Sequence, residues 1–184
     1  MDLAALVELA GLVAPDLPEV VDRARLAARD PATYRGRFPD DSWVADEDDQ
    51  LPLVAVVNAL VGNQRIAVID WRASPDETLA AFAGVLDAAH QELRVWTDGE
   101  AVVWNVDDPA TNGDTTPDRL IARIAGRLAQ HDLRCINLGG GSDTYCLALV
   151  PQQSFERSLA CARSAGFSEH LDLADEARAA GRTS

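Results

Sequence analysis

The sequence contains no lysine, and all 16 of its basic residues are arginine. Lysine codons are rich in A and T, so we interpret this absence as the bias of a GC-rich genome and not as part of a mechanism. Basic residues are also outnumbered by 30 acidic ones, which leaves a net charge of −14. Phosphate binding requires clustered positive charge, so this balance argues against nucleic acid and against an anionic membrane surface. It suits solubility or a basic partner.

Long apolar runs are absent as well. No segment approaches the roughly 20 apolar residues that a membrane span requires. The N-terminal stretch carries Asp2 and Glu8 and lacks the basic start of a signal peptide. We therefore expect a cytoplasmic protein. Its 184 residues fit one domain, which we place at 1–170, followed by a polar tail, 171–184, that we expect to be frayed.

Motifs for metals and cofactors are missing too. The three cysteines, Cys135, Cys146 and Cys161, lie in apolar segments without C-x-x-C spacing, so we predict buried thiols and no zinc site. The glycine-rich stretch 137–143 joins two strands and lacks a nucleotide-binding pattern. Residues 108–119 resemble a calcium loop only in part, because Arg119 occupies the closing position. The sequence predicts no metal and no cofactor.

What is present is a succession of helical and strand patterns. Apolar positions recur at helical spacing in six segments, and alternating or continuous apolar runs indicate strands around two turns, Asp98-Gly99 and the glycines before Asp143. Hairpins imply antiparallel pairing. We therefore predict an α+β fold: a single domain with a mixed or antiparallel sheet of about five strands packed with about six helices. Residues 31–50 are interpreted as a surface loop.

The stretch "RIAVIDWRASPDET", residues 65–78, carries the firmest local signals. Residues 66–69 are apolar on both faces, which is typical of a central strand covered on both sides. Ser74 to Glu77 form a capping box, with Pro75 at the first helical position. We interpret "DWR", between strand and helix, as an architectural junction in which the indole of Trp71 is buried.

The second hairpin allows a prediction of register. If residues 139–142 form a four-residue loop, Cys135 lies opposite Cys146 in the ladder. Both thiols are then buried on the same face of the sheet.

Two aspartates at strand ends are the candidates for catalysis. Asp70 ends one strand and Asp143 begins another, so on neighbouring strands they meet near Trp71, Arg72 and Tyr145. Two close carboxylates raise the pKa of one of them, which is how general acid–base pairs arise. In the alternative interpretation, Asp70 pairs with an arginine or accepts loop amides, and Asp143 serves the glycine turn.

An acidic segment is the main candidate for binding. Six of the ten residues 40–49 are acidic, and Phe38 and Trp43 lie beside them. Carboxylates steer a basic protein over long range, while aromatic side chains anchor it. We therefore expect a basic protein partner to dock on this segment, with the following binding candidates: Trp43, Asp46, Asp48, Asp49, Trp71, Arg72 and Tyr145.

A row of arginines leaves a second possibility open for that segment. Arg119, Arg123 and Arg127 follow one another at four-residue spacing on a predicted helix. The acidic segment could fold back onto this row and bind nothing. The row could equally receive an acidic ligand or remain a solvated surface, where each exposed ion pair contributes only ~0–1 kcal/mol.

Three stretches resemble a known family. "VIDWR" at 68–72, "GSDTYCLALVP" at 141–151 and "FERSLACARSAGF" at 155–167 are similar to an uncharacterised bacterial family with a D-W-[KR] strand and a late D-[ST]-Y strand. The resemblance covers about residues 58–167. It implies a small bacterial cytoplasmic α+β protein, and it supplies no activity, because the family is a domain of unknown function.

These observations favour a non-catalytic acidic module that binds another protein. Acidic α+β proteins that neutralise basic toxins, as immunity proteins do, are a subclass suggested by analogy alone. The alternative is a small enzyme that uses Asp70 and Asp143, and a purely structural role also remains open.

Overall fold

The computed structural model describes residues 1–39, 41, 48–89, 116–139 and 143–167. Within these ranges the chain forms seven α-helices and three β-strands. In chain order they are α1 (Leu3–Val13), α2 (Pro18–Arg29), α3 (Pro31–Arg37), α4 (Leu51–Gly62), β1 (Ile66–Asp70), α5 (Pro75–Ala89), α6 (Pro117–Ala129), β2 (Leu133–Asn137), β3 (Thr144–Pro151) and α7 (Phe155–Ala165), with a 3₁₀ turn, η2 (Gln152–Ser154), before α7.

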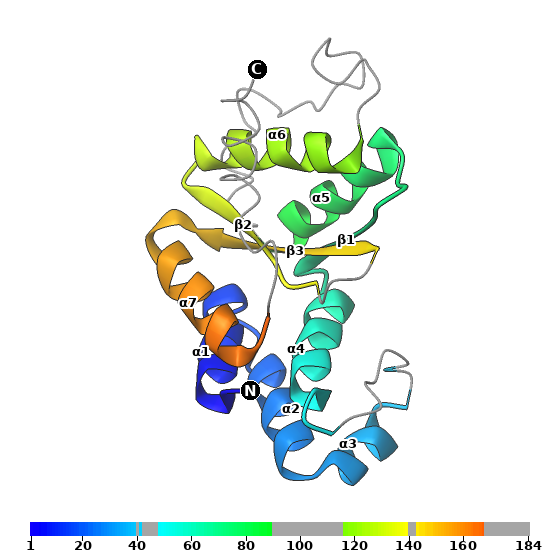
Figure 1. Cartoon of the computed structure of the whole chain (residues 1–184), viewed down its shortest axis with the longest axis vertical. Helices are drawn as coiled ribbons and strands as arrows, with labels where there is room; N and C mark the ends of the chain where they lie inside the picture. Colours follow the sequence, from blue (N-terminus) through cyan, green and yellow to red (C-terminus); the bar gives the residue numbers. More distant parts are fainter. Residues whose placement is uncertain (40, 42–47, 90–115, 140–142, 168–184) are drawn as a thin grey trace.

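The strands form an antiparallel sheet in the order β1-β3-β2. Helices α5 and α6 lie on one side of it, and α1, α2, α4 and α7 lie on the other (Figure 1). The predicted α+β class is confirmed. Five strands are not shown, since the described residues contribute three, and the predicted hairpin at 93–106 and the tail 171–184 lie outside them.

The sheet separates two hydrophobic cores. Alternate strand residues point to opposite faces, so each strand contributes to both cores. The first core joins the sheet to α1, α2, α4 and α7 through Ile66, Cys146, Ala148 and Val150. The second joins it to α5 and α6 through Ala67, Ile69, Cys135, Leu147 and Leu149.

Local capping fixes several helix ends. The Asp2 carboxylate accepts the N–H groups of Ala4 and Ala5 at the start of α1. The predicted capping box of α5 is confirmed, because Ser74 N–H donates to Glu77 Oε2 at 2.8 Å and Glu77 N–H donates to Ser74 Oγ at 3.3 Å. Helix α7 ends at Gly166, whose φ of +105° suits a residue without a Cβ.

The prediction of a loop throughout residues 31–50 is wrong at its start, where α3 forms. Asp30 caps this helix by accepting both the N–H and the hydroxyl of Thr33, and Pro31 fits the first turn. The ring of Tyr34 is fully buried, and its hydroxyl donates to Asp41. Burial and the neighbouring carboxylate raise the pKa of Tyr34.

The prediction that residues 66–69 form a central strand is also wrong for the described sheet. Strand β1 is the outer strand of the order β1-β3-β2, and 39% of Val68 is exposed. An apolar pattern predicts that the faces of a strand are buried. It does not predict whether a neighbouring strand pairs with each edge. Ile66, Ala67 and Ile69 are buried as expected.

The predicted register of the second hairpin is wrong. Cys135 lies opposite Leu149 and not opposite Cys146. The ladder continues past the end of β2, because Leu138 N–H donates to the Cys146 carbonyl at 2.7 Å. The side chain of Asn137 closes it, since Oδ1 accepts from Gly139 N–H and Cys146 N–H.

The shift by an odd number of residues places Cys135 and Cys146 on opposite faces of the sheet. All three cysteines are nevertheless buried, and none of them forms a disulfide. Burial raises the pKa of the Cys146 thiol.

Candidate functional site

The junction between β1 and α5 is built by hydrogen bonds around Asp70. Its Oδ1 accepts Arg72 N–H at 2.7 Å, and its carbonyl accepts Ala73 N–H at 2.9 Å. Trp71 N–H donates to the Asp143 carbonyl at 2.9 Å and so continues the β1–β3 ladder by one rung. These bonds turn the chain from the strand into the capping box.

The indole of Trp71 lies outside both cores. It is 45% exposed, so the prediction that it is buried is wrong. The chain leaves the sheet after Asp70, which carries the next side chain beyond the cover of the helices. The Arg72 guanidinium lies over the indole at 4.3 Å from the ring centroid, in cation–π geometry.

The two candidate catalytic aspartates lie at the same end of neighbouring strands. Asp70 is opposite Thr144, and Trp71 follows opposite Asp143. Side chains alternate along a strand, so this register directs the two carboxylates to opposite faces. The Asp70 carboxylate accepts a loop amide, as the alternative interpretation proposed. This geometry gives no support to an acid–base pair.

Tyr145 belongs to the packing of the second core. Its side chain is partly buried against that core, and its hydroxyl donates to Asp118 in the first turn of α6. The contact ties β3 to α6.

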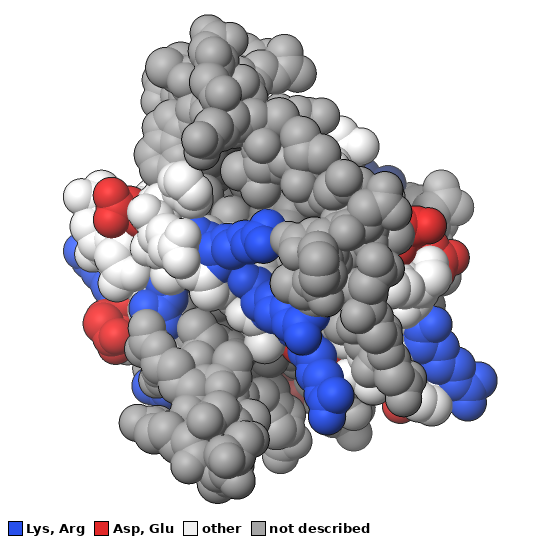
Figure 2. All heavy atoms as spheres, turned by 90° about the horizontal axis from the view of Figure 1, so that it is seen from above, with Lys and Arg blue, Asp and Glu red and all other residues white. Residues whose placement is uncertain are grey.

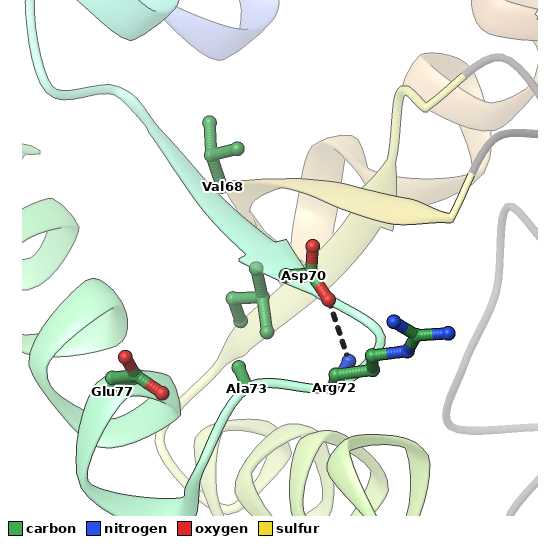
Figure 3. A pocket seen from close by; sticks show the side chains of 6 residues that line it. Val68, Asp70, Arg72, Ala73 and Glu77 are labelled. Carbon is green, nitrogen blue, oxygen red and sulfur yellow. Dashed lines mark hydrogen bonds between the residues drawn. The ribbon is translucent and has the colours of Figure 1, made fainter.

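A groove of about 520 Å³ runs beside the outer edge of β1. Its walls come from β1, from the junction and from the first turn of α5, and Figure 3 shows the side chains around it. Val68 and Asp70 face one side of the sheet, whereas Ile69 faces the other, so the groove straddles the strand edge. The lining residues are Val68, Ile69, Asp70, Arg72, Ala73 and Glu77.

The lining of the groove carries two carboxylates and one guanidinium, which leaves a net negative charge, and its carboxylates can accept further hydrogen bonds. Glu77 accepts from the Ser74 backbone and hydroxyl through Oε2, and these bonds lower the pKa of Glu77 and keep it ionised. In the described part of the chain, Glu77 Oε1 and Asp70 Oδ2 accept no hydrogen bond. The Arg72 guanidinium points away from Glu77 in Figure 3.

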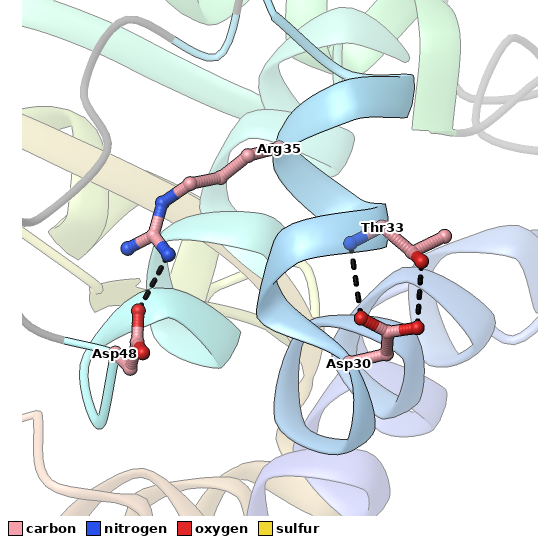
Figure 4. Close-up of polar contacts among 4 residues, drawn as sticks. All are labelled: Asp30, Thr33, Arg35 and Asp48. Atoms are coloured by element: carbon pink, nitrogen blue, oxygen red, sulfur yellow. Dashed lines mark hydrogen bonds and ion pairs between the residues drawn. The ribbon is translucent and has the colours of Figure 1, made fainter.

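Two of the three described carboxylates of the acidic segment make contacts within the molecule. Asp48 pairs with Arg35 of α3 at 2.5 Å (Figure 4), and Asp41 accepts from Tyr34. Asp49 is exposed. The remaining candidates on this segment, Trp43 and Asp46, lie outside the described residues.

The arginine row lies far from these carboxylates. Arg119, Arg123 and Arg127 are exposed on α6, and Figure 2 shows arginines in a row on the face seen from above. Helix α3, with Asp41 and Asp48 beside it, lies at the opposite end of the molecule in Figure 1. The acidic segment therefore does not meet the row through its described residues.

Sequence reasoning missed two parts of this site. It placed Val68 in the core, and it treated Glu77 only as a capping residue, although both line the groove. The signal for Glu77 was present, because a capping-box glutamate sits in the first helical turn beside the preceding strand end.

Among the residues that the structure describes, no group of three or more His, Cys, Asp or Glu side chains could hold a metal ion. In the same residues, no helix has both the length and the apolar character needed to cross a membrane.

The chain was compared with known proteins in three ways. A search of curated proteins and a search of solved structures found no significant match. The model of one protein family matches residues 5–173, which extends beyond the resemblance at 58–167 to include the N-terminal helices. The chain therefore belongs to the family described as the domain of unknown function DUF6630.

Proposed function

We propose that this chain is a non-catalytic module that binds a basic protein. The observation that carries the proposal is the β1 surface, formed by Val68, Asp70, Trp71, Arg72 and Glu77. Two of the large apolar side chains that are exposed in the described chain, Val68 and Trp71, lie there. Charged groups lie beside them at the groove. Exposed apolar side chains rimmed by polar groups are characteristic of interaction sites.

Trp71 supplies the anchor in this proposal. Tryptophan and arginine are enriched among the residues that dominate binding energies, and here they are stacked against each other. The stack holds the indole in one orientation before a partner arrives, which reduces the entropy lost on binding.

The charge of the molecule defines the class of partner. With a net charge of −14, the chain attracts a basic protein over long range and repels an acidic one. We propose that the acidic segment 40–49 contributes mainly to this steering, since Asp48 and Asp41 already have intramolecular partners. An immunity-like role, in which an acidic protein neutralises a basic toxin, fits this description by analogy of size, charge and fold class.

Site-specific photo-crosslinking tests the proposal. A photoreactive phenylalanine analogue replaces Trp71 in cells of the source organism, and a second chain carries it at Val61, an exposed apolar residue of α4. We expect the analogue at position 71 to crosslink one basic protein and the analogue at position 61 to leave it unlabelled.

The captured protein is then titrated with purified chain. Trp71→Ala should weaken binding tenfold or more, because losing a central aromatic anchor typically costs at least ~1–2 kcal/mol. Val61→Ala should leave affinity unchanged. Equal crosslinking from both positions, an acidic captured protein, or unchanged affinity of Trp71→Ala would each contradict the proposal.

A further inference from the structure

We infer that the outer edge of β1 accepts an extended cationic segment of the partner as an added β-strand, with a lysine or arginine side chain reaching Asp70 while Glu77 adds negative charge on the other face of the sheet. This inference rests on the proposed function and specifies how the basic protein is recognised.

The first argument is the direction of the backbone groups of β1. Antiparallel pairs alternate between hydrogen-bonded and non-hydrogen-bonded positions. Trp71 donates to Asp143, so the hydrogen-bonded positions of β1 are Ile69 and Ala67, and the residues between them point their N–H and C=O groups away from β3. Val68 is one of these residues.

The hydrogen bonds between β3 and β2 give the same result independently. Val68 lies opposite Cys146, and the Cys146 carbonyl accepts Leu138 N–H from the β2 side. That carbonyl therefore points away from β1, which makes Val68–Cys146 a non-hydrogen-bonded pair. Within the described chain, the N–H and C=O of Val68 and the N–H of Asp70 have no hydrogen-bond partner.

In the part of the chain that the structure describes, the edge also lacks three common forms of protection against pairing. Exposed edge strands commonly carry lysine, proline or a bulge. The sequence of β1, IAVID, contains no lysine or proline, and its five residues pair with β3 in continuous register. Its backbone is thus available for β-augmentation, in which main-chain hydrogen bonds supply affinity and alternate side chains supply specificity.

The groove supplies the side-chain specificity. It straddles the edge, so alternate side chains of an added strand lie beside Val68 and Asp70 on one face and beside Ile69 and Glu77 on the other. On the face of Val68 and Asp70, the methyl group of a threonine covers Val68, and an arginine two residues along the added strand meets Asp70 Oδ2, which accepts no bond from the described residues. On the other face, Glu77 Oε1 likewise accepts no bond from the described residues and adds to the negative field.

Charge selects a cationic partner over a second copy of this chain. Two copies paired through β1 would bring together two molecules of net charge −14, which repel each other. A cationic strand gains from the same field, and its basic side chain pairs with Asp70 without adding further carboxylates to the groove.

The test uses synthetic peptides and backbone NMR of the full chain. The probe is acetyl-TVRVTVR-amide, compared with acetyl-TVEVTVE-amide and with a version of the cationic peptide N-methylated at alternate amides. We expect the cationic peptide to slow hydrogen exchange at the Val68 and Asp70 amides at least tenfold. The other two peptides should bind at least tenfold more weakly.

Matched variants distinguish binding of the peptide in the groove from a general effect of the protein's negative charge. Asp70→Asn keeps the acceptor for Arg72 N–H and removes one charge, whereas Asp22→Asn removes one charge from an exposed site on α2, outside both the groove and the acidic segment. We expect Asp70→Asn to weaken binding of the cationic peptide at least fivefold and Asp22→Asn to leave it within twofold. Circular dichroism confirms that both variants are folded.

Several outcomes would overturn the inference. These are equal binding of the N-methylated peptide, equal effects of the two aspartate variants, or peptide binding that leaves the Val68 and Asp70 amides unchanged. Protection of those amides that grows with protein concentration in the absence of peptide would identify a second copy as the occupant. If Trp71 crosslinks a basic protein while the peptide result is negative, the proposed function stands and only the strand-addition mode fails.

Discussion

Replacing Asn137 by alanine should destabilise the protein more than most surface changes. The side chain is only 6% exposed, and its Oδ1 accepts from Gly139 N–H at 3.0 Å and from Cys146 N–H at 3.1 Å. Alanine would leave both donors buried without a partner. Each such donor costs ~1–3 kcal/mol, so Asn137→Ala should lower the free energy of unfolding by about 2–6 kcal/mol.

Urea denaturation followed by circular dichroism measures this loss. A typical domain unfolds with about 5–15 kcal/mol, so the midpoint should shift by a large fraction of its value while the slope stays the same. A loss below ~0.5 kcal/mol, the range of ordinary surface substitutions, would refute the reasoning, because it would mean that other groups or water satisfy both donors.

A second variant tests the same hydrogen-bonded end of the β2–β3 ladder, at Gly139 in place of Asn137. A Cβ on Gly139 would lie 2.9 Å from the Thr144 carbonyl oxygen and 3.0 Å from Asn137 Oδ1. Gly139→Ala should therefore destabilise the protein as well, since the nearer of these atoms belongs to backbone that the sheet holds. If Gly139→Ala left the free energy of unfolding unchanged, the backbone at Gly139 and Thr144 could move apart without an energetic cost.

Four other predictions concern the junction and one thiol. Ser74→Ala should cost about 1 kcal/mol through the lost cap of α5, as measured by urea unfolding. The pKa of Glu77 is lowered in the folded chain, so the ionised carboxylate stabilises the fold at any pH above the pKa of the unfolded chain. This stabilisation is lost as the pH falls through the folded pKa. The difference in the free energy of unfolding between wild type and Glu77→Gln should therefore shrink in acid. Trp71→Ala should change the free energy of unfolding by less than ~0.5 kcal/mol, and a loss of several kcal/mol would show that the indole is packed. Native Cys146 should react with thiol reagents far more slowly than in urea, and equal rates would contradict its burial.

The sequence predicted those parts of the fold that depend on local interactions. The capping box at 74–77 and most helices follow from residues within one or two turns of each other, so their patterns were sufficient. The burial of the three cysteines followed from their apolar surroundings. Helix α3 was missed because the charged residues after it gave the whole segment the composition of a loop.

The errors in the sheet arose from interactions between distant residues. The register of β2 and β3 depends on one side chain, Asn137, binding the backbone of Cys146 across the hairpin. No pattern in the glycine-rich stretch distinguishes this arrangement from a four-residue loop. The outer position of β1 depends on which strands pair, and the apolar content of residues 66–69 does not encode that choice.

The sequence predicted where the candidate site lies, but it did not predict how the side chains of the site are arranged. The sequence directed attention to residues 70–72, and the structure confirms that they leave a strand for a helix. Tryptophan is usually well buried, and the position of Trp71 at the last rung of the ladder, beyond the cover of the helices, explains why it is exposed. Asp48 was expected to await a partner, although it lies within reach of Arg35 on a helix that the sequence analysis did not foresee.

The packing of α1 against α7 has a consequence for synthesis on the ribosome. Asp2 N–H donates to the Ser164 carbonyl, and Glu8 pairs with Arg157, so the first helix is held by the last one that the structure describes. Contacts this distant in sequence form late and slow the folding of a chain. Helix α1 leaves the ribosome before α7 is synthesised and keeps part of its apolar surface exposed until more than 150 further residues have followed. The nascent chain thus passes through a long interval in which it exposes apolar surface of the kind that makes unfinished chains prone to aggregation.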